Sequence, residues 1–343
     1  MSAPTVSVIL PVYNGATDVE LAIDSILTQS FNDFELIAID DCSPRDNSLE
    51  IMRRMSAERA DPRLRVISLE RNHGLAGALN VGLDLARGRL IARQDQDDFS
   101  KPERLARQIA FFEANPACGM VGTGAEIWVG GAFTGRAHDH AAANNLLQHD
   151  LLVNNPFVHS SVMLRREVFD TVGTYCTDRA RQPPEDYELW SRVARRWEVA
   201  NLPERLVFYQ EAPGSMSRTG DNPFLDKLVI IAAENIAWWC GLEKPDQSCQ
   251  DAAALAHAAY SKLSDRADIG EITARAVTAS RAIADEHGAE GLSERTEQFV
   301  GNLRHHYFQA RHVPAYATPL IEAYRRLPLP AGFRRAVRRW LSR

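Results

Sequence analysis

The sequence predicts an α/β fold, with a Rossmann-like, mostly parallel sheet flanked by helices and a helical region at its C-terminal end. Two observations carry this prediction. Short β-branched runs alternate with amphipathic stretches over residues 5–95, which is the pattern of successive βαβ units. From about Asp221 onward, strand patterns give way to alanine-rich helical periodicity. We therefore expect an α/β domain in residues 1–220 and a helical region in residues 221–343.

Four strands are expected in the first part, each ending in polar residues or glycine, at residues 6–12, 34–40, 64–69 and 90–94. Helices are expected at about residues 17–29, 47–60, 75–87 and 102–112. Thr17 and Glu20 have the spacing of a capping box, Pro102 suits a first helical turn, and Gly88 suits a left-handed helix end. Further along, the pattern predicts strands at 119–129 and 161–164, an irregular stretch at 130–145 and a helix at 185–196.

The charge and cysteine content exclude several classes of protein. A net charge of −6 argues against a nucleic acid as partner, because binding phosphates requires concentrated positive charge. The five cysteines are scattered and never form C-x-x-C, so neither a disulfide framework nor a zinc site is expected. The N-terminal residues lack a basic segment, and the apolar run 6–12 is too short to span a bilayer. We expect a cytoplasmic protein.

The densest chemical signal is the run Asp95-Gln96-Asp97-Asp98, which directly follows an expected buried strand. Carboxylates this close repel one another when they are desolvated, and a bound cation offsets that cost. Their hard oxygen ligands suit Mg²⁺ or Mn²⁺ holding a diphosphate. The alternative is a solvated turn in which Asp98 caps a helix beginning at Phe99.

The ends of the first two strands carry further polar groups at the same expected sheet edge. Asp40-Asp41-Cys42-Ser43 could accept hydrogen bonds from a ribose hydroxyl or a base, although D-D-x-S also occurs at helix starts. The first strand ends in Pro11-Val12-Tyr13-Asn14, where an aromatic ring could stack on a base. Neither a dinucleotide-binding glycine motif nor a P-loop follows that strand.

A third acidic group lies at Glu185-Asp186, at the start of an expected helix. One of these carboxylates could act as a general base that takes the proton of an acceptor hydroxyl. Carboxylates also gain from the helix dipole at this position, so a capping role is the alternative.

Taken in order, these motifs resemble those of the family 2 glycosyltransferases. The resemblance covers about residues 4–217 and rests on six segments: VILPVYN (8–14), SILTQSFNDFEL (25–36), DDCS (40–43), NHGL (72–75), DQDDFSKPERL (95–105) and EDYELW (185–190). It implies a GT-A fold and an inverting transfer of sugar from a nucleotide diphosphate donor, commonly a uridine diphosphate sugar.

The resemblance also implies roles for particular residues. Pro11, Val12, Tyr13, Asn14 and Asp41 would contact the base, and Asn72, Gly74 and Gln96 would join the donor site. Asp95 would meet the ribose and share the Mn²⁺ or Mg²⁺ with Asp97. Asp186 would be the base, and Glu185 would orient the acceptor or cap the helix. His159, in the segment NPFVHSS (155–161), is a candidate acceptor contact, although a lone histidine is more often structural.

The sequence departs from the family pattern after Tyr209. A histidine often precedes the Gly-Ser-x-Ser stretch in relatives, whereas Gln210 and Glu211 stand in this region here. The contact made by that histidine would have to be replaced by water or Glu211, or be lost.

The C-terminal twelve residues, 332–343, contain five arginines and no acid, with apolar residues on one helical face. This pattern suits a basic amphipathic helix on an anionic membrane surface, or a terminal helix that packs on the body. We expect a cytoplasmic enzyme, peripheral on the inner face of the plasma membrane, that acts on a saccharide or lipid-linked acceptor in surface glycan synthesis. The alternatives are a nucleotidyltransferase, and a sugar-nucleotide-binding or scaffold protein without catalysis.

Overall fold

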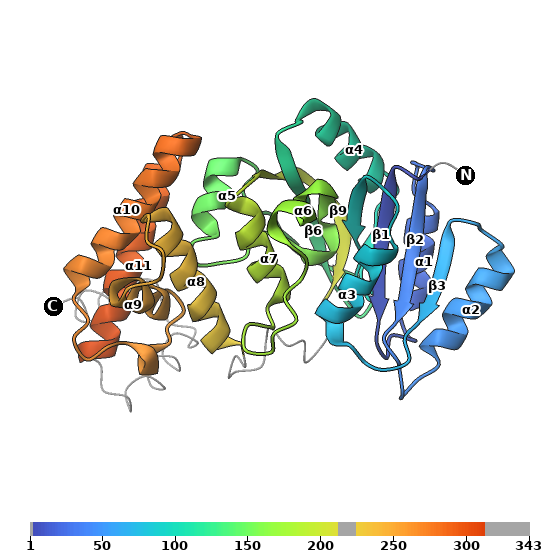
Figure 1. Cartoon of the computed structure of the whole chain (residues 1–343), viewed down its shortest axis with the longest axis horizontal. Coiled ribbons are helices and arrows are strands. Elements are labelled where there is room, and N and C mark those ends of the chain that lie inside the picture. The colour runs from blue at the N-terminus through green and yellow to red at the C-terminus, as the bar shows by residue number, and fades with distance from the viewer. Residues whose placement is uncertain (1–2, 212–223, 313–343) are drawn as a thin grey trace.

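The computed structural model describes residues 3–211 and 224–312. Within them, nine strands form one sheet in the order β3-β2-β1-β4-β8-β6-β9-β5, with β7 paired to β6 (Figure 1). The strands are β1 (Val6–Val12), β2 (Phe34–Asp40), β3 (Leu64–Ser68), β4 (Leu90–Arg93), β5 (Phe99–Ser100), β6 (Cys118–Val129), β7 (Ala132–His138), β8 (Met163–Arg165) and β9 (Glu198–Gln210). This arrangement confirms the α/β prediction.

The sheet has a parallel half and a mixed half. Strands β3, β2, β1 and β4 are parallel neighbours, as the alternating pattern predicted. Beyond β4 the sheet is mixed, because β8 runs antiparallel to both β4 and β6 while β9 runs parallel to β6. The carboxyl ends of β1, β2 and β4 therefore meet at one edge, where open α/β sheets bind ligands.

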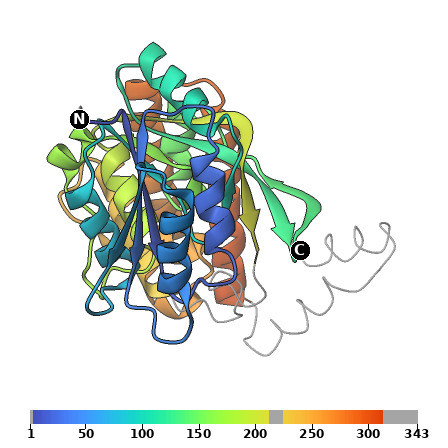
Figure 2. The same cartoon turned by 90° about the vertical axis from the view of Figure 1, so that its right-hand side faces the viewer.

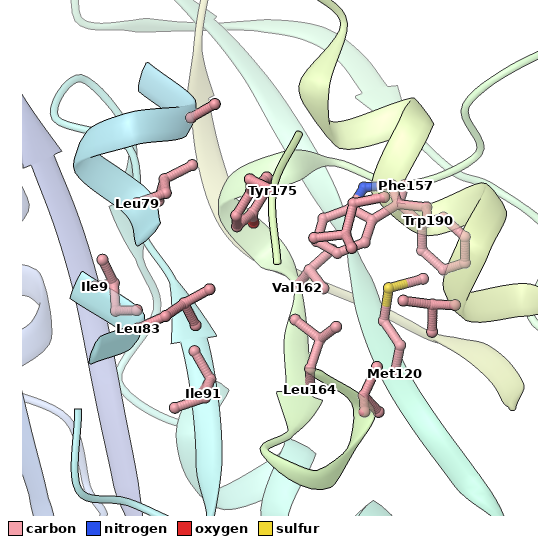
Figure 3. Close-up of a cluster of buried hydrophobic side chains, with 14 of the residues drawn as sticks. Ile9, Leu79, Leu83, Ile91, Met120, Phe157, Val162, Leu164, Tyr175 and Trp190 are labelled. Carbon is pink, nitrogen blue, oxygen red and sulfur yellow. The ribbon is translucent and has the colours of Figure 1, made fainter. Parts of the chain in front are cut away.

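Helices cover both faces of the sheet. They are α1 (Val19–Leu27), α2 (Ser48–Arg59), α3 (Gly74–Leu85), α4 (Arg104–Ala114), α5 (Asn144–Asp150), α6 (Glu167–Val172) and α7 (Glu185–Ala194). The apolar sides of α1, α2 and α4 share one core with the sheet, and those of α3, α6 and α7 share another. Figure 3 shows the second core, in which Ile9 of β1, Leu79 of α3 and Trp190 of α7 belong to one cluster.

The helical C-terminal region consists of α8 (Leu225–Trp239), α9 (Gln247–Ala256), α10 (Ile269–His287) and α11 (Leu292–His312). It has a core of its own and lies beside α5 and α7 (Figure 1). Asn235 of α8, which is buried, donates to the Leu151 carbonyl at 2.7 Å and to Ser191 Oγ at 2.9 Å, and accepts from Arg195 at 2.7 Å. These bonds join α8 to α7 and to the end of α5.

Two predicted helix ends are wrong. Helix α1 begins at Val19, and its cap residue Asp18 makes no side-chain capping bond, so Thr17 and Glu20 form no capping box. The backbone N–H groups of Asp18 and Val19 donate to the Gly15 carbonyl instead. Helix α3 ends at Leu85 and turns into extended backbone at Ala86.

Gly88 does not cap α3. It lies against β1, where its N–H donates to Ser7 Oγ at 2.8 Å. A Cβ atom at Gly88 would come within 2.5 Å of the Ser7 nitrogen, so close backbone approach requires glycine there.

Two other expectations are also corrected. Pro102 precedes α4 by two residues, and its carbonyl accepts from the Ser30 N–H at 2.8 Å. The stretch expected to be irregular, 130–145, contains β7 and the start of α5. Strand β7 escaped detection because most of its side chains are exposed, which leaves no alternation of apolar and polar residues.

Candidate active site

The end of β1 leads into a loop that the end of β4 holds in place. Pro11 and Val12 are buried within β1, whereas Tyr13 is 40% exposed and Asn14 adopts a left-handed conformation with φ of 51°. Gln96 accepts from the Tyr13 N–H at 2.7 Å and donates to the Tyr13 carbonyl at 3.3 Å. The segment after β1 is therefore in direct contact with the acidic segment after β4. Tyr13 and Asn14 are the residues of the β1 segment that are open to a ligand.

Asp41 lies at the end of β2 and is joined to the start of α3. Its buried carboxylate accepts from the His73 N–H at 2.7 Å. Asn72 donates to the Asp41 carbonyl at 3.1 Å and accepts from the Gly74 N–H at 3.1 Å. Burial raises the pKa of Asp41, and the hydrogen bonds from the α3 start partly offset that rise.

The alternative that Asp40-Asp41 caps a helix is wrong, because α2 begins later, at Ser48, with Asn47 as its cap residue.

The acidic cluster is partly buried and electrostatically strained. Asp95 pairs with the guanidinium of the buried Arg93. Burial, followed by the charge of Asp95, raises the pKa of Asp97 to about 6. Asp98 is 1% exposed and accepts from Ser160 and from the Gln210 N–H, and its pKa lies well above the ordinary value because of burial.

The structure rejects the solvated-turn alternative for this cluster. Phe99 and Ser100 form β5 rather than a helical turn, so Asp98 caps no helix. Its carboxylate instead joins the loop after β4 to the 3-10 helix at His159–Ser161 and to the end of β9.

The donor chemistry of Asp95 and Asp97 fits a divalent cation. Both are hard carboxylate ligands, and the raised pKa of Asp97 marks negative charge that a cation would offset. Among the described residues, no group of three or more His, Cys, Asp or Glu side chains could hold a metal. Substrate oxygens and water would have to complete the coordination, as is common for Mg²⁺.

The acidic pair at the start of α7 forms the other side of the site. Asp186 Oδ1 accepts from the Tyr187 N–H at 2.7 Å, and Oδ2 accepts from Asn155 at 2.8 Å. Glu185 is 7% exposed, and burial together with the charge of Asp186 raises its pKa to about 7, against a smaller lowering by Arg93. Glu185 thus titrates near neutral pH.

His159 faces the same region in its neutral form. Burial, followed by the charge of Arg93, lowers its pKa to about 4. Its Nε2 lies 3.3 Å from the Tyr175 hydroxyl, and its ring packs edge-on against Trp190 with centroids 5.9 Å apart. The charges of Asp95 and Asp186 both act on this ring and partly offset the lowering of its pKa.

Three residues that the sequence reasoning did not assign support this arrangement. Arg93 pairs with Asp95, and Asn155 holds Asp186. The fully buried Arg104 donates to Gln94, Ser100 and the Arg93 carbonyl, and so supports the acidic loop from below. An arginine within the apolar run LIARQ was the available signal for Arg93, because a charge inside a buried strand requires a partner.

The end of β9 departs from the family pattern, as the sequence indicated. Glu211 is ion-paired with Arg136 of β7. The Gly-Ser-x-Ser stretch that follows lies outside the described residues.

Comparison with known proteins identifies the family. The sequence model described as "Glycosyl transferase family 2" matches residues 7–173. EpsE of Bacillus subtilis is 34% identical over 67% of this chain and 81% of its own length. The chain belongs to glycosyl transferase family 2. The O-antigen biosynthesis glycosyltransferase WbnJ of Escherichia coli is 33% identical to it over 60% of this chain and 79% of WbnJ.

Solved structures agree with the fold of this family 2 glycosyltransferase. TarS of S. aureus, solved with UDP-GlcNAc, superposes with a TM-score of 0.59 at 17% identity over 91% of this chain and 92% of that one. The mannosyltransferase PcManGT of Pyrobaculum calidifontis, solved with GDP-Man and Mn²⁺, gives 0.52 at 18% identity over 100% and 84%. The chain has the GT-A fold. None of its described helices is long and apolar enough to cross a membrane.

Proposed function

We propose that this glycosyltransferase moves a sugar from a uridine diphosphate donor to a hydroxyl of a saccharide or lipid-linked acceptor in surface glycan synthesis. The observation that carries the proposal is the meeting of three strand ends, which brings Tyr13, Asp41 and Gln96 to one edge of the sheet. TarS with UDP-GlcNAc supports the donor class, and the relatives WbnJ and AmsE, a protein of amylovoran biosynthesis in Erwinia amylovora, support the product class.

In this proposal the donor lies along that edge. Tyr13 and Asn14 flank the base, and Asp41 accepts a hydrogen bond from it, because its carboxylate is already oriented by the start of α3. Asp95 meets the ribose. Asn72 and Gly74 act by fixing Asp41 rather than by reaching the donor, since their polar atoms bond to one another and to the Asp41 carbonyl.

Asp97, with Asp95, would hold Mn²⁺ or Mg²⁺, and the solved structure of PcManGT with Mn²⁺ supports this class of cofactor. When bound, such an ion stabilises the negative charge on the departing diphosphate. Two carboxylates cannot fill its coordination shell, so donor oxygens and water must complete it.

The transfer proceeds with inversion in this proposal. The acceptor oxygen forms a bond to the anomeric carbon while the bond from that carbon to the diphosphate oxygen breaks, and Asp186 takes the hydroxyl proton. Asn155 and the Tyr187 N–H hold the carboxylate in a fixed orientation for this step. His159 is neutral at pH 7, so it can accept or donate a hydrogen bond to the acceptor without adding charge.

The experiment that tests the function is a thermal-shift screen of uridine, guanosine and thymidine diphosphate sugars, each with and without Mn²⁺. We expect a uridine diphosphate sugar to stabilise the protein most, and Mn²⁺ to increase that shift. NMR of the product then reports the anomeric configuration. Stabilisation by another nucleotide class would replace the donor, and a retained configuration would refute the inverting step.

A further inference from the structure

A row of aromatic side chains lies on the hairpin formed by β6 and β7. Trp128 of β6 is directly opposite Phe133 of β7, with ring centroids 6.2 Å apart. Phe208 of β9 packs edge-on against Trp128 at 5.3 Å. Phe133 is 46% exposed, and Figure 2 shows the hairpin extending away from the body of the molecule. The three rings, here called the aromatic row, thus come from three neighbouring strands, β7, β6 and β9.

A surface hollow of about 750 Å³ continues from the aromatic row. It is lined by parts of β6 and β9 and by the segments beside them, including Lys101, Glu126, Asp139, His140, Glu204 and Arg205. Lys101 connects the two features, because its Nζ lies 2.7 Å from Glu126 and 5.1 Å from the centre of the Phe208 ring. Trp128 Nε1 also donates to Glu126 at 3.4 Å.

The charges around the hollow neutralise one another. Asp139 receives two hydrogen bonds from Arg205, at 2.7 and 2.6 Å. Glu126 pairs with Lys101, and Glu204 pairs with Arg107. A polyanion such as a nucleic acid would need an excess of positive charge here. A neutral ligand rich in hydroxyl groups could instead form hydrogen bonds with both the basic donors and the carboxylate acceptors around the hollow.

We propose that the aromatic row and the hollow form a binding site for a neutral oligosaccharide. A pyranose ring has an apolar C–H face that packs on aromatic rings and a hydroxyl edge that bonds to charged side chains. Phe133 and Trp128 supply the first kind of surface. The carboxylates and the guanidinium of Arg205 supply the second, because hydrogen bonds to charged groups are the stronger ones.

The position of the row connects it to the active site. Trp128 is the direct neighbour of Gln210 across the β6–β9 pair, and the Gln210 N–H donates to Asp98 at 2.8 Å. The row therefore begins one strand away from the acidic cluster. This inference rests on the proposed function: the saccharide that the aromatic row binds is the part of the acceptor glycan that has already been built.

The test compares the native chain with Phe133→Ala. Binding of cellohexaose, maltohexaose, mannohexaose and chitohexaose is measured by isothermal titration, with a heparin hexasaccharide as the anionic probe. We expect at least one neutral hexasaccharide to bind, and Phe133→Ala to weaken that binding about tenfold. Val129→Ala is the matched control, because Val129 is also exposed on this hairpin but alternates to the other face. It should bind like the native chain.

The inference is overturned if none of the four neutral probes binds the native chain, if Phe133→Ala binds them equally well, or if heparin binds more tightly. Thermal shifts with UDP and Mn²⁺, measured on the same samples, separate this inference from the proposed function. Nucleotide binding without saccharide binding removes the oligosaccharide site and leaves the donor proposal standing. Saccharide binding without nucleotide binding does the reverse.

Discussion

The side-chain amide of Asn155 donates to Oδ2 of Asp186 at 2.8 Å. This bond joins the segment before the 3-10 helix to the first turn of α7, and it leaves Asp186 fixed by two donors, the second being the Tyr187 N–H. If Asp186 is the base of the proposed function, its carboxylate is oriented before any acceptor arrives, and orientation of the reacting groups is a large part of catalysis.

Replacing Asp186 by Asn should stop transfer while leaving donor binding nearly unchanged. The variant keeps the size of the side chain but removes its ability to accept a proton. Loss of general-base assistance typically lowers rates by about 10²–10⁴-fold. Transfer is measured as release of UDP in the presence of acceptor, and donor binding is measured by calorimetry. Glu185→Gln is the control, and transfer at the native rate by Asp186→Asn together with an inactive Glu185→Gln would exchange the two roles.

Replacing Asp97 by Ala should abolish the dependence of UDP binding on Mn²⁺. Burial and the charge of Asp95 raise the pKa of Asp97, so a cation bound there would offset that charge. Calorimetric titration of UDP with and without Mn²⁺ measures the effect. Asp84→Ala, on the exposed side of α3, is the matched control and should retain the metal dependence. An Asp97 variant whose UDP affinity still responds to Mn²⁺ would exclude this residue as a ligand.

The raised pKa of Glu185 predicts that the contribution of this residue to the stability of the metal-free protein falls as pH increases from 5 to 8. The folded state holds the proton up to about pH 7, whereas the unfolded chain releases it near 4.5. The stabilisation is therefore complete below the unfolded pKa and is lost as pH rises through the folded value. The shift corresponds to as much as about 3 kcal/mol in the free energy of unfolding.

Urea denaturation at pH 5, 6, 7 and 8 measures this dependence. Relative to the native chain, Glu185→Gln should gain stability as pH rises from 5 to 8, whereas Glu113→Gln, on an exposed surface, should run parallel to the native profile. Parallel profiles for the native chain and Glu185→Gln would contradict the assignment of the shift to Glu185.

Deleting residues 332–343 should weaken binding to anionic membranes. This segment lies outside the described residues, and its five arginines with an apolar stripe carry the prediction. Sedimentation with phosphatidylglycerol vesicles compares the full chain with the deleted form, and phosphatidylcholine vesicles serve as the control. Equal sedimentation of both forms would favour a terminal helix that packs on the protein.

The parallel half of the sheet was predictable because β1, β2 and β4 are buried on both faces and read as apolar runs. The meeting of the polar residues after β1, β2 and β4 followed from the same reasoning, because the carboxyl ends of parallel strands lie at one edge of a sheet. Local pattern could not predict β7, whose side chains are mostly exposed, or the role of Gly88, which depends on contact with Ser7 of β1, 81 residues earlier.

The partner of Asp186 could not be named from the sequence. Asn155 begins the segment 155–161 that was singled out for His159, but its bond to Asp186 spans 31 residues and is visible only in the fold. Arg93 is a different case, because a charge buried in a strand requires a partner, although the sequence does not show which residue that partner is. Asp95, two residues on, became identifiable as that partner through the fold.

The bonds made by Asn235 bear on how this chain can be recombined with others. Its amide nitrogen donates hydrogen bonds to the Leu151 carbonyl and to Ser191, and its amide oxygen accepts one from Arg195. If α8 to α11 were replaced by the equivalent helices of another transferase, these buried groups would lose their hydrogen-bond partner unless the new α8 carried an amide at the position of Asn235. Each unpaired group would lower the free energy of unfolding by about 1–3 kcal/mol. The family match ends at residue 173. Helix α7, which carries Asp186, and helix α8, which is hydrogen-bonded to α7 through Asn235, both lie after that residue. Chimeras should therefore be joined upstream of α7, so that this helix and α8 are inherited together.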